Sequence, residues 1–299
     1  MAKDIMNLMD LSTDELREII KLSHRYRQDR TLNKTHLSGK TIGLIFLKNS
    51  TRTRVSFETG VNQLGGYPMY MDQNSLQIGR GESFEDTAKV LSRYLDGIVI
   101  RGHEHEGIKS FADACSIPVI NALTDTFHPC QLLADMQLID QIRGSLEGAK
   151  VTFMGDSACN MALSWIYAAH MTGMELTLCG PEKFHPPKEF LASIGNPTNI
   201  KVTADPREAA EDCEFFYTDV WVSMGFEEEA AERAKIFQRY QVNSELLAGA
   251  RKDVRVLHCL PAYRGKEITA EVLEGPHSVV FDQAENRLHA QKAAMTIKF

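Results

Sequence analysis

Hydroxyl and guanidinium groups stand together in one short stretch of the chain, Ser50-Thr51-Arg52-Thr53-Arg54. The preceding run, 41–47, is short, apolar and rich in β-forming residues, which predicts a buried strand. After the stretch, apolar residues recur with helical spacing from Phe57 to Leu64, and the glycine pair 65–66 predicts the end of a helix of about three turns. The stretch is therefore expected where a strand ends and a helix begins.

This position favours the binding of an anion, and of phosphate in particular. The first backbone N–H groups of a helix have no partner within the helix and carry partial positive charge. Hydroxyl donors and a guanidinium fork at the same end complete a set of donors that suits a phosphate group. We call Ser50–Thr53 the phosphate cradle. The alternative is an ordinary Ser or Thr helix cap with two solvated arginines.

The segment FLKNSTRTRVSFE, residues 46–58, resembles the carbamoyl-phosphate signature of the aspartate/ornithine carbamoyltransferase family. The resemblance extends over nearly the whole chain. It implies that four residues hold the phosphate of carbamoyl phosphate, namely Ser50, Thr51, Arg52 and Thr53. We assign no direct ligand contact to Arg54.

Residues 72–83 are polar, contain glycines and lack a hydrophobic period, which predicts a mobile loop. A plain linker is the alternative interpretation. In the family this loop carries a glutamine that reaches the carbamoyl-phosphate site of a neighbouring subunit, and Gln77 stands at the matching place. The resemblance therefore implies a homotrimer whose active sites are shared between subunits.

Two further basic residues follow predicted strands. Arg101 ends the apolar strand 97–100, and a cation at such a place is costly unless it faces an anion. His128 precedes Pro129 at the predicted start of a helix, in an HPxQ pattern that Gln131 completes. A lone histidine before a helix is otherwise a cap or a surface residue. By the resemblance, Arg101 binds the phosphate and the carbamoyl oxygen, His128 donates to the carbamoyl oxygen, and Gln131 contacts the carbamoyl amide.

The run His103-Glu104-His105-Glu106 has side chains of the metal-binding type. The sequence suggests no third ligand for a metal ion at this place. We therefore predict a solvated turn.

The predicted strand 151–154 is followed by Gly155-Asp156, as at the start of a dinucleotide-binding fold. We reject that interpretation because the GxGxxG pattern and its acidic partner are missing. In the family this turn commonly carries two adjacent asparagines. Here Cys159 occupies the first place, and Asn160 matches the second, which binds the amino-acid substrate.

The predicted strand 214–217 leads to a DxxxSMG motif at residues 219–225. This motif separates the members of the family that use ornithine from those that use aspartate or putrescine. An acidic side chain suits a cationic diamino acid and would repel an aspartate. The resemblance implies that Asp219 and Ser223 hold the α-amino end of ornithine and that Met224 shapes the pocket. A surface loop is the alternative, against which the apolar residues within the motif argue.

An HCLP motif, residues 258–261, follows the predicted strand 255–257. A cysteine after an apolar strand is usually an inert core residue. In the family, however, this cysteine lies beside the reacting δ-amine, so we assign Cys259 and Leu260 to the carbamoyl-phosphate side of the site. Tyr263 stands where histidine is common, and we expect it to affect only the shape of the loop.

Strand and helix patterns alternate in both halves, which predicts an α/β protein with two doubly wound parallel-sheet domains and an active site in the interdomain cleft. The expected carbamoyl-phosphate-binding domain is 1–143, and the expected ornithine-binding domain is 148–284. The final helix, 285–299, is expected to pack back on the first domain. It carries Arg287, which matches a carbamoyl-phosphate ligand of the family. We count Val279–Asp282, just before it, as a further strand.

The composition is that of a globular protein, with 43% hydrophobic and 24% charged residues in 299. A net charge of −7 argues against a nucleic-acid partner, so any anion site must be local. No run is long and apolar enough to cross a membrane, and the first residues lack the apolar core of a signal peptide. The six cysteines form no CxxC pair, which favours free thiols in a reducing cytoplasm.

The implied reaction transfers the carbamoyl group of carbamoyl phosphate to the δ-amino group of L-ornithine, giving L-citrulline and phosphate. Both arginine biosynthesis and the breakdown of citrulline fit this step of arginine metabolism. The expected catalytic residues are Arg101, His128 and Cys259, and oxyanion stabilisation is expected from Thr53, Arg101 and His128. No metal or organic cofactor is expected, because carbamoyl phosphate is already activated.

Two other functions remain alternatives. The nearer is a carbamoyltransferase for another amine such as putrescine, against which the intact DxxxSMG motif argues. The more distant is a non-catalytic relative that binds phosphate or an amino acid, against which the full set of matching ligands argues.

Overall fold

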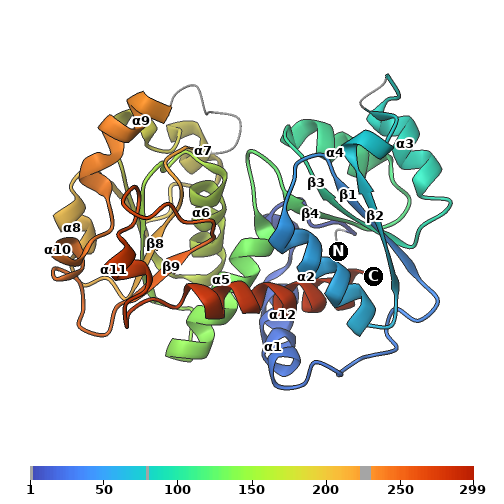
Figure 1. Cartoon of the computed structure of the whole chain (residues 1–299), viewed down its shortest axis with the longest axis horizontal. Coiled ribbons are helices and arrows are strands. Elements are labelled where there is room, and N and C mark those ends of the chain that lie inside the picture. Colours follow the sequence, from blue (N-terminus) through green and yellow to red (C-terminus); the bar gives the residue numbers. More distant parts are fainter. Residues whose placement is uncertain (1–2, 79–80, 223–229) are drawn as a thin grey trace. The chain divides into compact units, whose positions relative to one another are not determined.

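The computed structural model describes residues 3–78, 81–222 and 230–299 (Figure 1). The chain divides into two compact units. Unit 1 comprises Met1–Gln137 and Glu285–Phe299, and unit 2 comprises Leu138–Ala284. Both divisions fall within helices, the first in α5 (Pro129–Arg143) and the second in α12 (Val280–Lys298). Unit 1 is therefore built from two separate stretches of the chain.

Unit 1 contains a four-stranded parallel sheet with the strand order β2-β1-β3-β4. Its strands are β1 (Thr41–Phe46), β2 (Tyr67–Asp72), β3 (Gly97–Arg101) and β4 (Val119–Leu123). Since β1 lies between β2 and β3, the strand order reverses at the boundary of β1 and β3. In open parallel sheets ligands bind beyond the carboxyl ends of the strands at such a reversal.

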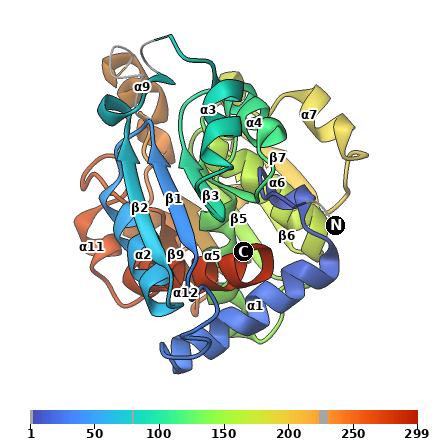
Figure 2. The ribbon, with the colours of Figure 1, turned by 90° about the vertical axis from the view of Figure 1, so that its right-hand side faces the viewer.

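The helices of unit 1 cover this sheet. Apart from α5 and α12 they are α1 (Thr13–Gln28), α2 (Thr51–Gln63), α3 (Phe84–Leu91) and α4 (His105–Ala114), with short 3-10 turns at Leu8–Asp10 and Gln73–Ser75. Buried residues of α3 and α4 share one core with Ile45, Ile98 and Ile100 of the strands. Helices α1 and α2 pack with α12, because Tyr26 Oη lies 2.7 Å from Thr296 Oγ1 and Lys292 Nζ donates to Gln63 Oε1 at 3.0 Å (Figure 2).

Unit 2 contains a five-stranded parallel sheet with the strand order β7-β6-β5-β8-β9. Its strands are β5 (Lys150–Met154), β6 (Glu175–Cys179), β7 (Ile200–Thr203), β8 (Phe215–Thr218) and β9 (Arg255–His258). Here the order reverses between β5 and β8. The loops after these two strands are therefore the expected place for a ligand.

Helices lie on both faces of this second sheet. They are α6 (Asn160–Thr172), α7 (Lys188–Ser193), α8 (Pro206–Ala210), α9 (Ala230–Phe237), α10 (Ser244–Leu247) and α11 (Ala270–Leu273), with 3-10 turns at Glu182–Phe184 and Gln238–Tyr240. Trp165 of α6 packs edge-on against Tyr217 of β8, with ring centroids 5.3 Å apart. The neighbouring Phe216 belongs to a core with Phe237 of α9 and Val272 of α11. Successive strand residues thus serve opposite layers.

The predicted fold class, two parallel-sheet α/β domains, is confirmed. One prediction is wrong, because Val279–Asp282 is not a strand: α12 begins at Val280. Val279, just before this helix, donates its N–H to the carbonyl of Val256 in β9 at 3.0 Å. The edge strand β7 was not expected from the sequence.

Candidate functional site

The phosphate cradle begins α2 directly after β1, as predicted. Ser50 is the N-cap, and its Oγ accepts the N–H of Thr53 at 3.2 Å. Thr51 and Arg52 are exposed, whereas Thr53 is buried. The start of this helix therefore offers an anion backbone donors, hydroxyl groups and one solvent-facing guanidinium.

Arg287 of α12 connects the cradle with α5. Its Nη1 donates to Gln131 Oε1 at 2.7 Å, and its Nη2 donates to Thr53 Oγ1 at 3.2 Å. All three side chains are at most 5% exposed. The structure thus brings together three of the predicted ligands, which come from stretches of the chain far apart in sequence.

Arg101 and His128 lie on the same side of unit 1, at the carboxyl ends of β3 and β4. Both are buried, with exposures of 7% and 5%. Burial lowers the pKa of His128 well below its usual value, and the nearby charges of Arg287, Arg101 and Arg52 lower it further. His128 is therefore neutral at pH 7 and can donate one ring N–H to a carbonyl oxygen. A neutral imidazole donor that feels the charges of three guanidinium groups suits an anion that carries a carbonyl group.

Asp135 belongs to this arrangement, although the sequence analysis did not assign it. Gln131 Nε2 donates to Asp135 Oδ1 at 2.8 Å, and Asp135 is fully buried. A carboxylate only accepts, so this bond fixes the Gln131 amide with Oε1 toward Arg287. The helical spacing of four between Gln131 and Asp135 was the available signal.

Gln77 lies beyond the end of β2, in the loop that follows the 3-10 turn Gln73–Ser75. Its side chain is exposed, and its carbonyl accepts the N–H of Glu82 at 3.3 Å. The structure leaves this side chain in solvent rather than in the Arg287–Thr53–Gln131 group.

In unit 2, Asp219 and Cys259 follow the neighbouring strands β8 and β9 and contact each other. Cys259 Sγ donates to Asp219 Oδ1 at 2.9 Å, and the N–H of Val220 donates to the same oxygen at 2.7 Å. Burial raises the pKa of Asp219, although the nearby His258 side chain and the hydrogen bond from Cys259 oppose this shift. Asp219 is therefore a partly desolvated carboxylate, which a cationic ligand would stabilise.

The other predicted residues of unit 2 have different surroundings. Asn160 is the first residue of α6, after the N-cap Cys159, and is half-buried at the carboxyl end of β5. Burial and the charges of Asp156 and Asp219 raise the pKa of Cys159 well above its usual value, so its thiol stays protonated. Ser223 and Met224 lie outside the described residues.

His258 and Glu267 support the turn that carries Cys259 and Leu260, and neither was assigned from the sequence. His258 Nδ1 accepts the N–H of Leu260 at 2.9 Å, so its Nε2 carries the proton and donates to Glu267 Oε1 at 3.1 Å. Both side chains are fully buried. Glu267 Oε1 also accepts the N–H of Tyr263 at 2.6 Å.

This support matters because Leu260 has a φ of 57°, in the left-handed region that a bulky residue rarely adopts. The imidazole of His258 holds the Leu260 N–H in that conformation. The Cys259 thiol, the His258 ring and the Asp219 carboxylate each place one polar atom within 4.8 Å of the others. They form a compact acid–base group.

Arg233 of α9 was also missed, and it supports the Asp219 segment. Its Nε donates to the carbonyl of Trp221 at 2.6 Å, and its Nη2 forms an ion pair with Asp156, which lies just beyond β5. The Arg233 side chain is only 8% exposed. The loops after β5 and β8, at the strand reversal of unit 2, are thus joined by one guanidinium.

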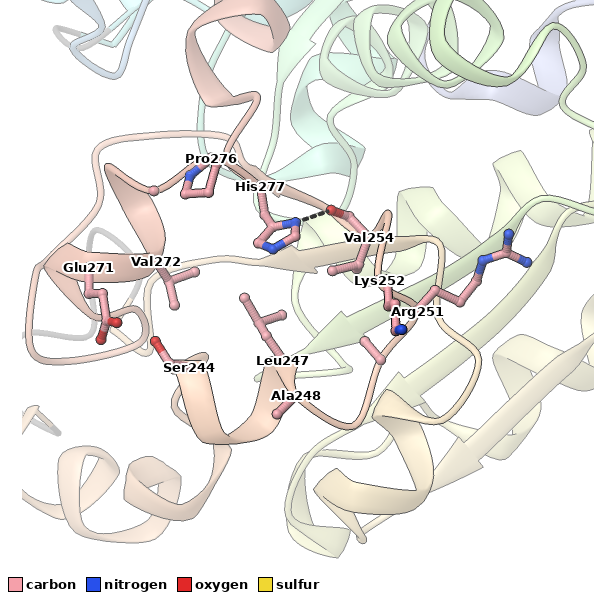
Figure 3. A pocket seen from close by; sticks show the side chains of 12 residues that line it. Ser244, Leu247, Ala248, Arg251, Lys252, Val254, Glu271, Val272, Pro276 and His277 are labelled. Carbon is pink, nitrogen blue, oxygen red and sulfur yellow. Dashed lines mark hydrogen bonds between the residues drawn. The ribbon is translucent and has the colours of Figure 1, made fainter.

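A separate cavity of about 470 Å³ lies between α10, α11 and the segment that leads into β9 (Figure 3). Leu247, Val254, Val272 and Pro276 line it, and His277 Nδ1 bonds to the carbonyl of Val254 at 3.0 Å. No predicted site residue lines this cavity. Within the part of the chain that the structure describes, no helix is both long and apolar enough to span a bilayer.

Comparison with known proteins identifies the family of both halves. Residues 3–141 match the family described as aspartate/ornithine carbamoyltransferase, carbamoyl-P binding domain. Residues 147–297 match the family described as aspartate/ornithine carbamoyltransferase, Asp/Orn binding domain.

Whole-length relatives agree. The chain is 48% identical over 303 residues to an ornithine carbamoyltransferase of Oceanobacillus iheyensis, covering 99% of this chain and 94% of the relative. It is 45% identical over 301 residues to one of Methanoculleus marisnigri, covering 99% and 96%.

A solved structure of ornithine carbamoyltransferase from Pyrococcus furiosus is similar with a TM-score of 0.91 and 42% identity, over 98% of this chain and 96% of that one. One from Thermus thermophilus has the same TM-score and 36% identity, over 100% and 99%. The predicted resemblance is confirmed, and this chain belongs to the aspartate/ornithine carbamoyltransferase family.

Proposed function

We propose that this protein transfers the carbamoyl group of carbamoyl phosphate to the δ-amino group of L-ornithine, giving L-citrulline and phosphate. The observation that carries the proposal is the set of buried bonds from Arg287 to Thr53 of the cradle and to Gln131, in the same unit as the neutral donor His128. A phosphate needs cationic partners, whereas a carbonyl oxygen beside it is well served by a neutral donor. The relatives named ornithine carbamoyltransferase support the choice of substrate.

In unit 1, the cradle and Arg101 bind the phosphate, and Arg287 holds Thr53 and Gln131 in place. Thr53, Arg101 and His128 stabilise the negative charge that develops on the carbamoyl oxygen. Gln131 Oε1 accepts from Arg287 and has a second lone pair, which accepts from the carbamoyl NH₂ group. Leu260 and Gln77 complete the carbamoyl-phosphate contacts, the latter from a neighbouring subunit.

In unit 2, Asp219 and Ser223 hold the α-amino end of ornithine, with Asn160 and Met224 as further contacts. The δ-amine must lose a proton before it attacks, because a group with a pKa near ~10 is mostly ammonium at pH 7. Cys259 orients the amine. The ammonium proton is released to solvent before the attack. The new C–N bond forms as the C–O bond to phosphate breaks, phosphate leaves with the bonding electron pair, and it takes up the proton that the attacking nitrogen loses.

A substrate assay tests this function. Purified protein is given carbamoyl phosphate with ornithine, putrescine or aspartate in separate reactions, and the carbamoylated product is measured. We expect rapid formation of citrulline and little product from the other two amines. Preferred carbamoylation of putrescine would favour the rival amine specificity, and no product from any amine would favour a binding protein.

We further propose a homotrimer in which Gln77 serves the site of a neighbouring subunit. The exposed side chain of Gln77 supports this assignment, as do the exposed apolar residues Val55 of α2 and Tyr67 and Met69 of β2. The strand β2 is an edge of its sheet, and exposed apolar groups beside a sheet edge are commonly covered by another chain.

Mixing two inactive variants tests the shared site. Gln77→Ala and Arg101→Ala are each expected to be nearly inactive. After subunit exchange at equal amounts, about a quarter of the sites in a closed ring would pair an intact Gln77 with an intact Arg101. Light scattering gives the number of subunits, and recovered citrulline formation reports the pairing. Verified exchange without recovery would show that Gln77 acts within its own subunit.

We place the reaction in the cytoplasm. All six cysteines are free, which is expected of a protein kept in a reducing compartment. Fractionation of the source cells, with a citrulline assay on each fraction, tests the compartment.

A further inference from the structure

Three loops deliver the principal groups of the phosphate site, and a carboxylate on one of them contacts the other two. Lys48 precedes the cradle, His103 follows Arg101, and Asp125 precedes His128. Lys48 Nζ donates to Asp125 Oδ1 at 2.9 Å, and His103 Nδ1 lies 3.6 Å from Asp125 Oδ2. The N–H of Asp125 donates to the carbonyl of His103 at 2.9 Å. We call Lys48, His103 and Asp125 the loop clamp.

A second imidazole holds the same turn. His105 Nδ1 lies 3.0 Å from Thr124 Oγ1, and its ring packs edge-on against Phe127, with centroids 5.0 Å apart. Thr124 Oγ1 in turn accepts the N–H of Phe127 at 3.1 Å. Both histidines of the run 103–106 therefore face the turn that leads into His128. The sequence had predicted only a solvated turn for that run.

The burial of Lys48 is the unusual part of this arrangement. Its side chain is 7% exposed, whereas that of Asp125 is 45% exposed. A mostly buried ammonium is costly to desolvate, and an apolar side chain of similar size would fill the space more cheaply. The strands β1 and β4 are not neighbours, because β3 lies between them. The ion pair therefore reaches across the loop that follows Arg101.

We propose that the loop clamp positions His128 and Arg101 relative to the cradle, and that Lys48 and Asp125 thereby set the affinity and turnover of carbamoyl phosphate. This inference rests on the proposed function. The groups that bind one small anion come from three separate loops, and small displacements of such groups weaken binding and slow the reaction. A bond between the loops removes their independent motion before the ligand binds.

The chain offers a matched control for Lys48. Lys298 Nζ donates to Glu15 Oε1 at 2.7 Å, and these side chains are 4% and 10% exposed. This pair is a buried lysine–carboxylate bond of unit 1 that joins α12 to α1, and it includes no group of the loop clamp. A purely structural role for Lys48 would make both lysines behave alike.

The experiment compares Lys48→Met with Lys298→Met in the full-length protein. For Lys48→Met we expect kcat/KM for carbamoyl phosphate to fall at least ~10-fold, with a raised KM and a lowered kcat. For Lys298→Met we expect a loss of thermal stability similar to that of Lys48→Met, and less than a ~2-fold change in kcat or KM.

Asp125→Asn should reproduce the kinetic loss of Lys48→Met, and the double variant Lys48→Met/Asp125→Asn should be little worse than either single variant. Lys48→Arg, which keeps the charge, should retain most activity.

Calorimetric titration with inorganic phosphate provides a readout that does not need turnover. Weaker phosphate binding in Lys48→Met and Asp125→Asn, but not in Lys298→Met, supports the loop clamp even if the unmodified protein forms no citrulline. Unchanged phosphate binding and kinetics in Lys48→Met, or equal losses in the two lysine variants, would overturn it. If Lys48→Met does not fold, the kinetics and the phosphate titration of Asp125→Asn and Lys48→Gln test the loop clamp in its place.

Discussion

Among the candidate ligands that the structure describes, most of those in unit 1 belong to helices, whereas most of those in unit 2 lie in loops after strands. The cradle begins α2, Gln131 lies in the first turn of α5, and Arg287 lies in α12. Asp219 and Cys259 instead follow the ends of β8 and β9 without entering a helix. Both units are built on an all-parallel sheet, so the difference lies in how the ligands are held.

The difference corresponds to the chemistry of the two proposed substrates. A phosphate is served by several fixed donors at once, and a helix start supplies them from a rigid backbone. An amino acid is distinguished from its analogues by a few side chains, which loops can present. Those loops then need support from other residues, which Arg233 and the His258–Glu267 pair provide. Substitutions should therefore act directly in unit 1 and partly through supporting groups in unit 2.

The largest effect is expected from removing an arginine of unit 1. Arg101→Ala or Arg52→Ala deletes a charge-assisted partner of the phosphate, worth ~1.5–3 kcal/mol in binding, so kcat/KM should fall by ~10- to 150-fold or more. Steady-state kinetics with varied carbamoyl phosphate measure this. Arg54→Ala is the control, because Arg54 is exposed and bonded to Glu58 at 2.9 Å. Equal losses in Arg54→Ala and Arg52→Ala would contradict the separate role of Arg52.

A somewhat smaller and more selective effect is expected in unit 2. Asp219→Asn removes the proposed partner of the α-ammonium, so the KM for ornithine should rise ~10- to 100-fold. The KM for carbamoyl phosphate should change little, because the Arg287–Thr53–Gln131 group remains intact. If this variant instead lost carbamoyl-phosphate binding and bound ornithine normally, the assignment of Asp219 to ornithine would be wrong.

A weaker effect is expected from the support of the Leu260 turn. Glu267→Gln keeps the size of the side chain but removes the charge that holds the His258 Nε2–H, so kcat should fall ~3- to 10-fold. Turnover at saturating concentrations of both substrates measures it. His258→Gln should give a loss of similar size, and the double variant should add little. Strict additivity would mean that the two residues act separately.

The smallest effect concerns stability rather than activity. Burial lowers the folded-state pKa of His128, whereas an unfolded histidine titrates near ~6.5. Below that pH the unfolded chain gains a proton that folded His128 does not, so the free energy of unfolding falls as pH falls. This contribution reaches at most about 1.4 kcal/mol per pH unit. The measurement is the free energy of unfolding by denaturant at pH 7 and at pH 5. Between these pH values it should change less in His128→Gln than in the unmodified protein, by up to that amount. An equal change in the two proteins would show that folded His128 titrates normally.

The motifs made the strands and helices near the ligands predictable. The apolar run before the cradle became β1, and the period from Phe57 to Leu64 became α2, because local sequence and tertiary packing favour the same structure there. The prediction failed for Val279–Asp282, whose β-branched start suggests a strand although α12 begins at Val280. The strand β7 was missed because it is short, lies at a sheet edge and is mostly half-exposed.

The supporting residues could not be predicted in the same way. Lys48 and Asp125 are separated by 77 positions, and Arg233 and Asp156 likewise by 77. Neither residue of such a pair has a local pattern that reveals its partner, because only the folded chain brings them together. Asp135 is the exception, since its helical spacing from Gln131 was visible in the sequence.

The division of unit 1 into two stretches affects the order in which the chain can fold during its synthesis. Unit 2 is continuous, so all of it has left the ribosome before residues 285–299 emerge. Until then the bonds from Arg287 to Thr53 and Gln131, and from Lys292 to Gln63, are absent. A translation product that stops before Arg287 would have a finished amino-acid-binding half beside an unfinished phosphate site. On the proposed function, such a fragment would bind ornithine while being unable to retain carbamoyl phosphate.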